Sequence, residues 1–287
     1  MKISLDCFPC FLRQALEASR ISGADDHEQQ DVLNAIMNAL LNVSPDITPP
    51  QIGWLIHSTI REITGNCDPY NEIKTFHNSQ VMEIEEDLVR LVNESDEPFV
   101  DALRLAGTGN LIDMGPERQW TDIQEIFQSF SSKNSDFFDP STFERAIKDS
   151  GTLLYIGDNA GEIVLDKILV NMIVREMDID ITYAVRGKPI INDATMEDAR
   201  FVGMTDIVKV IDNGADFPGV VLKSCSEEFL DYYHNADIIL AKGQGNYESL
   251  SDESENIFFL LQAKCPVIAD KIGCHVGDLV LKNGKTQ

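Results

Sequence analysis

The stretch LLYIGDNAGEIVLDKILV, residues 153–170, decides the fold of this chain. Four apolar residues and a glycine lead into Asp158 and Asn159, and a longer apolar-rich run begins after Glu162. The short apolar run predicts a buried strand, and the longer run predicts a helix. The pattern therefore places an acid and an amide at the end of a strand, just before the N-terminus of a helix, where backbone N–H groups are free.

The same alternation continues to the end of the chain. Short apolar runs that end in polar residues or glycine predict further strands, namely DITYAVRG (180–187), IVKVIDNG (207–214), DIILAKGQG (237–245) and PVIADKIG (266–273). Stretches with helical character separate most of them, such as SEEFLDYYHN (226–235) and SENIFFLLQA (254–263). Strands that alternate with helices predict a mostly parallel sheet covered by helices on both faces.

Residues 1 to about 150 instead show the apolar period of helices. In CFPCFLRQALEASR (7–20), Phe11, Ala15 and Ala18 share one face. The stretch PPQIGWLIHSTIREITG (49–65) begins with prolines and ends at a glycine, which is typical of helix boundaries. We therefore expect a helical subdomain, residues 1–150, packed on a doubly wound α/β domain, residues 151–287, with SSKNSDFFDPS (131–141) as the best boundary candidate.

The charge of the chain excludes some partners. Its 287 residues include 23 Lys and Arg against 48 Asp and Glu, a formal net charge of -25, which repels nucleic acid and anionic membranes but not metal cations. Asp6 and Pro9 interrupt any secretory signal, and no apolar run is long enough to span a membrane. We expect a cytoplasmic protein whose six cysteines are thiols or ligands rather than disulfides. The sequence leaves the oligomeric state open.

Polar side chains collect at the predicted carboxyl ends of the strands. Asp158 and Asn159 follow the first strand, and Arg186 follows the second, with Asp193 a few residues on. Ligands bind beyond this edge of a parallel sheet, and carboxylate and amide oxygens suit Mg²⁺ or Mn²⁺. Taken alone, Asp158 and Asn159 favour a helix cap, but Asp193 and Lys242 on the same edge favour a site. The remaining strand ends carry DNG (212–214), KGQGN (242–246) and DK (270–271).

Two glycine-containing stretches are candidates for substrate contact. AKGQGN (241–246) is similar to a loop in which backbone N–H groups and an ammonium cradle a phosphate, and its candidate residues are Lys242, Gly243, Gly245 and Asn246. The alternative is a strand-to-helix turn with a solvated lysine. AGTGNLID (106–113) repeats the Gly-x-Gly-Asn pattern, so Asn110 and Asp113 are candidates if this segment folds over the sheet edge. Otherwise it is a helix end with a glycine cap.

Cys7 and Cys10 have the spacing of half a zinc site or of a redox pair. A complete zinc site needs further ligands, and the other cysteines qualify by residue type only. Two buried, inert thiols are an equal alternative. We expect these thiols to have a structural role, in which a second metal ion is one option, and no part in catalysis.

With these residues in view, the chain resembles the metal-dependent damage-control phosphatases, a family long catalogued as a domain of unknown function. The resemblance covers nearly the whole chain, and the N-terminal CxxC is similar to that of the archaeal and bacterial branch. It rests on CxxC (7–10), DPYNEIK (68–74), GTGNLID (107–113), GDNAGEIVLDK (157–167), RGKPIINDAT (186–195) and AKGQGNYESL (241–250), in this order.

The resemblance implies a helical subdomain on a Rossmann-like α/β/α sandwich. It implies a divalent metal, Mn²⁺, Mg²⁺, Co²⁺ or Ni²⁺, held by Asp158, Asn159 and Asp193, and a phosphate-binding Lys242. Asn110 and Asp113 would also line the pocket. The implied reaction is the removal of phosphate from small phosphorylated metabolites, such as sugar phosphates or nucleotide-related compounds, often damaged or side-product ones.

The implied mechanism gives Asp158, Asp193 and Lys242 catalytic roles. The metal would act as a Lewis acid, and Lys242, with Arg186 as the next candidate, would neutralise charge in the transition state. Asp158 is a ligand only or also a nucleophile; the lack of an Asp-x-Asp-x-Thr arrangement favours water. Two rival hypotheses are a carboxyl methyltransferase that uses S-adenosylmethionine and a non-enzymatic protein that binds a phosphometabolite.

Overall fold

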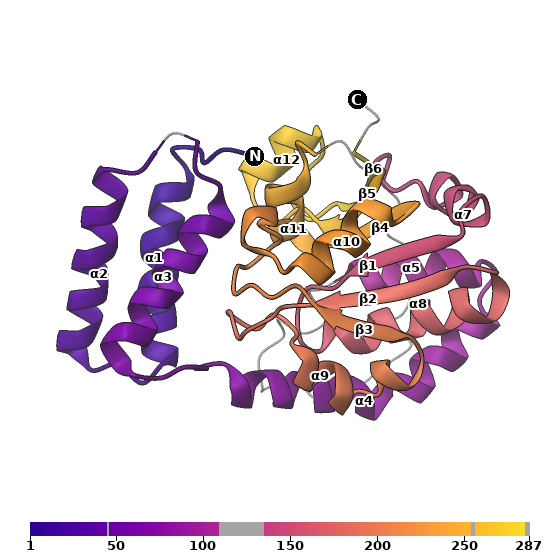
Figure 1. Ribbon diagram of the computed structural model, residues 1–287, viewed down its shortest axis with the longest axis horizontal. Helices are drawn as coiled ribbons and strands as arrows, with labels where there is room; N and C mark the ends of the chain where they lie inside the picture. The colour runs from indigo at the N-terminus through magenta and orange to yellow at the C-terminus, as the bar shows by residue number, and fades with distance from the viewer. Residues whose placement is uncertain (45, 109–134, 254–255, 285–287) are drawn as a thin grey trace.

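One six-stranded sheet forms the centre of the α/β part in the computed structural model, which describes residues 1–44, 46–108, 135–253 and 256–284 (Figure 1). The strand order is β3-β2-β1-β4-β5-β6, the order of a doubly wound Rossmann fold. All neighbouring pairs are parallel except β5 and β6, which are antiparallel. The strands are β1 (Thr152–Ile156), β2 (Asp180–Val185), β3 (Lys209–Asp212), β4 (Ile238–Lys242), β5 (Ile257–Gln262) and β6 (Leu279–Asn283).

Helices cover both faces of this sheet, so the predicted α/β sandwich is confirmed. Successive side chains of β1 point to opposite faces: Leu153 and Tyr155 join one hydrophobic cluster, and Leu154 and Ile156 join the other. The first cluster is shared with α4 (Asn71–Glu94), α5 (Pro98–Gly107), α7 (Pro140–Lys148), α8 (Glu162–Glu176) and α9 (Met196–Phe201). The second is shared with α10 (Glu227–Asn235), α11 (Gly243–Leu250) and α12 (Pro266–Ile272).

Two of the predicted elements are wrong in type. The run IFFLLQ, predicted as part of a helix, is β5, and all six of its residues are buried. The run PVIADKI, predicted as a strand, is α12, with Pro266 in its first turn. A strand buried on both faces has no alternation, so its apolar run looks like that of a buried helix. Asp270 and Lys271 therefore lie in a helix and not at a strand end.

The first three helices form a bundle with its own core, to the left of the sheet in Figure 1. They are α1 (Cys7–Ile21), α2 (Asp26–Leu41) and α3 (Pro49–Thr64). Asp25 and Thr48 begin α2 and α3 with capping boxes, and the left-handed Gly65 ends α3. The division at residue 150 stays a prediction, because α4, α5 and α7 pack against the sheet and only α1–α3 have a separate core. None of the described helices has the length and apolar character of a membrane span.

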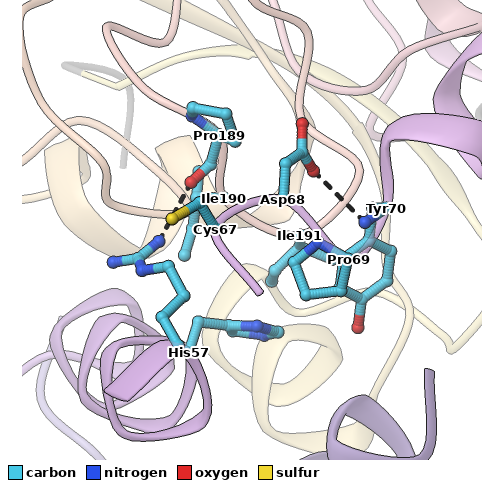
Figure 2. Close-up of a pocket in the computed structure, with 9 residues that line it drawn as sticks. His57, Cys67, Asp68, Pro69, Tyr70, Pro189, Ile190 and Ile191 are labelled. Carbon is cyan, nitrogen blue, oxygen red and sulfur yellow. Dashed lines mark hydrogen bonds between the residues drawn. The ribbon is translucent and has the colours of Figure 1, made fainter. Parts of the chain in front are cut away.

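A small cavity of about 10 Å³ lies where α3 meets the α/β part (Figure 2). His57 borders it from α3, and residues 67–70 and 189–191 close it. His57 is 4% exposed, and its buried Nε2 finds no hydrogen-bond partner among the described residues. Burial, reinforced by the charge of Arg61, lowers the pKa of His57 to about 4. The cavity is far smaller than a metabolite, so it is not the candidate active site.

We predict that His57 makes the protein less stable in mild acid. Its pKa of about 4 in the folded protein lies below the ordinary value of 6.5, so as the pH falls the unfolded chain takes up the proton first. Between these two pH values the wild-type protein should lose about 1.4 kcal/mol of unfolding free energy per pH unit relative to His57→Phe. Denaturant unfolding over this range measures the difference, and a difference that does not change with pH would contradict the assignment. His27→Phe, at a side chain 85% exposed, is the control.

Candidate functional site

A cleft of about 600 Å³ lies between the helical bundle and the carboxyl edge of the sheet. It lies beside the switch point between β1 and β4, where the order in which strands are added to the sheet reverses, and doubly wound folds bind ligands at this position. The bundle contributes Cys7, Cys10, Arg13 and Gly53 to the lining, and the α/β part contributes Asp158, Asn159, Asp193, Gln244, Gly245, Lys264 and Cys265.

Asp158 and Asn159 lie at the floor of this cleft. Nδ2 of Asn159 donates to Oδ2 of Asp158 at 3.1 Å and to Oε1 of Glu162 at 2.9 Å. Because both amide hydrogens are used there, the atom that remains to face a ligand is the acceptor Oδ1. The N-cap residue of α8 is Gly161. Asp158 and Asn159 thus line the cleft, and neither is the N-cap residue of the helix.

Backbone hydrogen bonds bring Asp193 beside this pair. Ala194 N donates to Asp158 O, and Ala160 N donates to Asn192 O, both at 2.8 Å. Nε of Arg186, a residue 1% exposed, donates to Oδ2 of Asp193 at 2.6 Å. Its Nη2 lies 3.5 Å from Oδ1 of Asp158. The structure therefore brings together Asp158, Asn159, Asp193 and Arg186, which the sequence placed at two different strand ends.

Lys242 occupies a different place from the one the sequence suggested. Its Nζ lies 2.7 Å from Oδ1 of Asp166 and 3.5 Å from Oε2 of Glu162, and the residue is 1% exposed. Burial alone disfavours the ammonium, but the charges of Asp166 and Glu162 outweigh it, and the pKa of Lys242 is raised. Gly243 starts α11 directly, so the segment is a strand-to-helix turn and not a loop. Within the described structure Lys242 does not reach the cleft lining.

These side chains form a buried charge cluster with an excess of negative charge. We define it as Asp158, Glu162, Asp166, Arg186, Asp193 and Lys242, which are four acids and two bases in contact through the bonds above. Burial, and then the charges of Asp193 and Glu162, raise the pKa of Asp158 well above its ordinary value. Burial also raises the pKa of Asp193, against the opposing effect of Arg186. When all six groups are ionised, the cluster carries a net charge of -2.

A divalent cation fits this cluster in charge and in donor type. Two carboxylates and one amide oxygen, from Asp158, Asp193 and Asn159, are hard ligands of the kind that Mg²⁺ and Mn²⁺ prefer. No three His, Cys, Asp or Glu side chains in the described ranges come together closely enough to hold a metal by themselves. The fit therefore depends on the amide oxygen of Asn159.

Gly243 allows the turn after β4 to approach Asp158. Its φ is +79°, and a Cβ added there would lie 1.9 Å from Oδ2 of Asp158. Gly245 lines the cleft, and a Cβ there would lie 2.4 Å from the carbonyl oxygen of Pro218. Asn246 is fully buried, and it accepts from Nη2 of Arg186 at 3.2 Å. Asn246 therefore supports the charge cluster instead of facing the cleft.

The remaining sequence candidates divide into two groups. Cys7 and Cys10 both line the cleft, where Sγ of Cys10 accepts from Nη2 of Arg13 at 3.8 Å. Whether they hold a second metal stays a prediction. Asn110 and Asp113 lie outside the described residues.

Sequence reasoning assigned no role to Glu162 and Asp166. Both are buried acids, four residues apart on α8, whose other buried residues are apolar. Tyr155 and Tyr183 donate their hydroxyls to Asp166 at 2.7 and 2.8 Å. The sequence did contain a signal for these two residues, namely acids that lie four residues apart within an otherwise apolar helix. An acid is tolerated at a buried position only where other groups pair with it.

The comparisons with known proteins agree with this geometry. The model of a protein family described as "Damage-control phosphatase ARMT1-like domain" matches residues 3–280 of this chain. A crystal structure of a DUF89 family protein from Pyrococcus horikoshii superimposes with a TM-score of 0.92 at 30% identity, covering 99% of this chain and 100% of that one. The fold is thus that of an established α/β class. The chain belongs to the ARMT1-like damage-control phosphatase family.

Three archaeal relatives align over almost their whole length. Damage-control phosphatase PH1575 of Pyrococcus horikoshii is 32% identical over 99% of both chains. A damage-control phosphatase of Archaeoglobus fulgidus is 36% identical over 98% of this chain and 99% of its own. The uncharacterized protein MJ0202 of Methanocaldococcus jannaschii is 34% identical over 98% of this chain and 95% of its own.

We predict that Gly243→Ala destabilises the protein more than Gly23→Ala. The two glycines have similar φ values, +79° and +83°, but an added Cβ meets Asp158 only at Gly243 and nothing within 4 Å at Gly23. The backbone strain at Gly23 should cost about 1–2 kcal/mol, and the clash should add about 1–3 kcal/mol at Gly243. Urea unfolding of both variants tests this. Equal losses would mean that Asp158 moves aside without resistance.

Proposed function

We propose that this protein is a divalent-cation-dependent phosphatase that hydrolyses phosphate monoesters of small metabolites, of the damaged or side-product kind. The observation that carries the proposal is the buried charge cluster, in which four acids face two bases, beside a cleft of about 600 Å³. Membership of the family, and the two relatives named damage-control phosphatases, support the same reaction.

In this proposal Asp158, Asn159 and Asp193 hold the cation through their side-chain oxygens. When bound, the cation supplies Lewis-acid activation of a phosphoryl oxygen and neutralises charge. Arg186 fixes Asp193 by the 2.6 Å bond and lies 3.5 Å from Asp158, so it sets the spacing of the two acids. Glu162 fixes the orientation of the Asn159 amide. Water is the proposed nucleophile.

The walls of the cleft suit a small anionic substrate. Arg13 from α1 and Lys264 after β5 are the two cationic side chains among its described lining residues, one from the bundle and one from the α/β part. The charge of Lys264 acts on Asp158 and opposes the rise of its pKa. In a chain with a net charge of -25, such local cations are needed for a phosphate to approach. We propose these two residues as the substrate anchors at the mouth of the cleft.

The decisive experiment measures phosphate release and cation binding together. Protein stripped with a chelator should hydrolyse p-nitrophenyl phosphate only after Mn²⁺, Co²⁺, Ni²⁺ or Mg²⁺ is added. Asp158→Asn and Asp193→Asn should each lower turnover by on the order of a hundredfold or more, because each removes a charged oxygen ligand. In chelator they should stay folded, since each removes one excess buried charge.

Asp149→Asn, at an exposed acid that precedes β1, at the opposite end of this strand from Asp158, is the control. Calorimetry with Mn²⁺ should show binding to the wild-type and control proteins only. Full turnover in excess chelator would disprove the proposal, and methyl transfer from S-adenosylmethionine without phosphate release would favour the rival enzyme.

We propose that Lys242 acts through Glu162 and Asp166 and does not touch the substrate. Lys242→Met should lower the unfolding free energy by about 3–5 kcal/mol, because it leaves buried acids unpaired. In the protein that remains folded, kcat should fall and KM should change little. Adding Asp166→Asn should restore part of the stability, since it removes one of those acids. A variant with unchanged stability and a raised KM would show instead that Lys242 contacts the phosphate.

A further inference from the structure

The loop that carries Asp193 leaves the sheet and returns to it. Arg186 N donates to Ala194 O at 2.9 Å at the base of this loop, and Asp193 N donates to Ile190 O at 3.1 Å inside it. We call residues 187–193 the Asp193 loop. Its returning arm pairs with the residues after β1, because Ala160 N donates to Asn192 O at 2.8 Å. The conformation of this loop therefore sets the position of the Asp193 carboxylate relative to Asp158.

This loop contains backbone strain two residues before Asp193. Ile191 has φ +46°, and it is the one non-glycine residue with positive φ among those that the structure describes. A β-branched side chain strongly disfavours this conformation, so surrounding contacts must hold it in place. Ile191 borders both the large cleft and the small cavity beside His57, where Figure 2 shows it beside Pro69.

Arg61 of α3 supplies such a contact. Its Nη1 donates to the carbonyl oxygen of Pro189 at 3.1 Å, at the tip of the Asp193 loop. Its Nη2 donates to Oδ2 of Asp216 at 2.7 Å, and Oδ1 of Asp216 accepts from Nε1 of Trp54, also on α3, at 2.9 Å. The side chains of Arg61 and Asp216 are 21% and 22% exposed, so solvent screens this pair only in part.

The first residues of the Asp193 loop are hydrogen-bonded to the segment 213–216, which contains Asp216. Gly187 N donates to Oδ1 of Asn213 and to the carbonyl oxygen of Ala215, each at 2.9 Å. Lys188 N donates to the same Ala215 oxygen at 3.2 Å. The Arg61 guanidinium thus binds both the Asp193 loop, at Pro189, and the segment 213–216, which holds the start of that loop.

We propose that Arg61 is a positioning residue for the cation site. By holding Pro189 and Asp216 at once, it keeps Ile191 in its strained conformation and Asp193 within reach of Asp158 and Asn159. The helical bundle then has a function beyond forming one wall of the cleft, because its docking sets the affinity of the α/β part for the cation. This inference rests on the proposed function insofar as a divalent cation binds at Asp158, Asn159 and Asp193.

The test is a Mn²⁺ titration of the full chain, followed by electron paramagnetic resonance. Arg61→Ala should raise the dissociation constant of Mn²⁺ by on the order of ten- to a hundredfold, as loss of a residue that orients a ligand does. Trp54→Phe is the matched control, because it removes the other α3 hydrogen bond to Asp216 and leaves the contact with Pro189. It should bind Mn²⁺ like the wild-type protein even if thermal unfolding shows equal destabilisation of both variants.

A rescue separates positioning from a general loss of structure. Glycine adopts positive φ without strain, so Arg61→Ala combined with Ile191→Gly should recover part of the Mn²⁺ affinity that Arg61→Ala loses. If Arg61→Ala does not fold, Arg61→Lys replaces it, because one ammonium cannot donate to both acceptors in the same geometry. Equal Mn²⁺ affinity in the wild-type protein and the Arg61 variants would overturn the inference and leave the proposed function intact. If the wild-type protein binds none of Mn²⁺, Co²⁺, Ni²⁺ and Mg²⁺, the proposed function itself fails.

Discussion

The close packing of four carboxylates at the end of β1 is the constraint on which the rest of the structure depends. Charged groups that are removed from water need partners, and here they receive two cations and two tyrosine hydroxyls. Two glycines beside the cluster, Gly157 and Gly243, leave room for these side chains because they have no Cβ. A Cβ at Gly157 would lie 2.3 Å from the Tyr183 hydroxyl, and one at Gly243 would overlap the Asp158 carboxylate. Small residues at these two positions are therefore a consequence of the charges.

The partners balance only part of that charge, and the imbalance is what gives the site its chemical character. Replacing the whole cluster, acids and bases together, by apolar residues of similar volume would be neutral or favourable for the folded state, so the cluster is no gain in stability. Such clusters are common at sites where a ligand supplies the missing charge. A divalent cation would neutralise the excess, and the cleft in front of Asp158 and Asn159 gives it access. The same excess explains why stability and activity should respond in opposite directions to removal of an acid.

The two parts of the chain contribute differently to this site. The α/β part supplies the acids from rigid strand ends and from the first turns of α8, which keeps their spacing fixed. The bundle supplies the opposite wall of the cleft and contacts the loops through α3, where Trp54 stacks on Phe217 with ring centroids 5.5 Å apart. A substrate in the cleft would touch both parts. Changes in the docking of α3 can therefore alter binding without altering any acid.

The sequence by itself determined the fold class, the helical start of the chain and the strand ends at which polar residues gather, because these follow from local apolar periods and from turn residues. It also gave the family, through motifs whose order and spacing are specific. Only the tertiary structure decided that IFFLLQ is a strand, that Lys242 faces Asp166 and that Arg61 reaches the Asp193 loop. An apolar run buried on all sides has no period that reveals its type. The partner of a charged side chain is likewise fixed by residues far away in the chain, which come close only when the sheet and the bundle pack together.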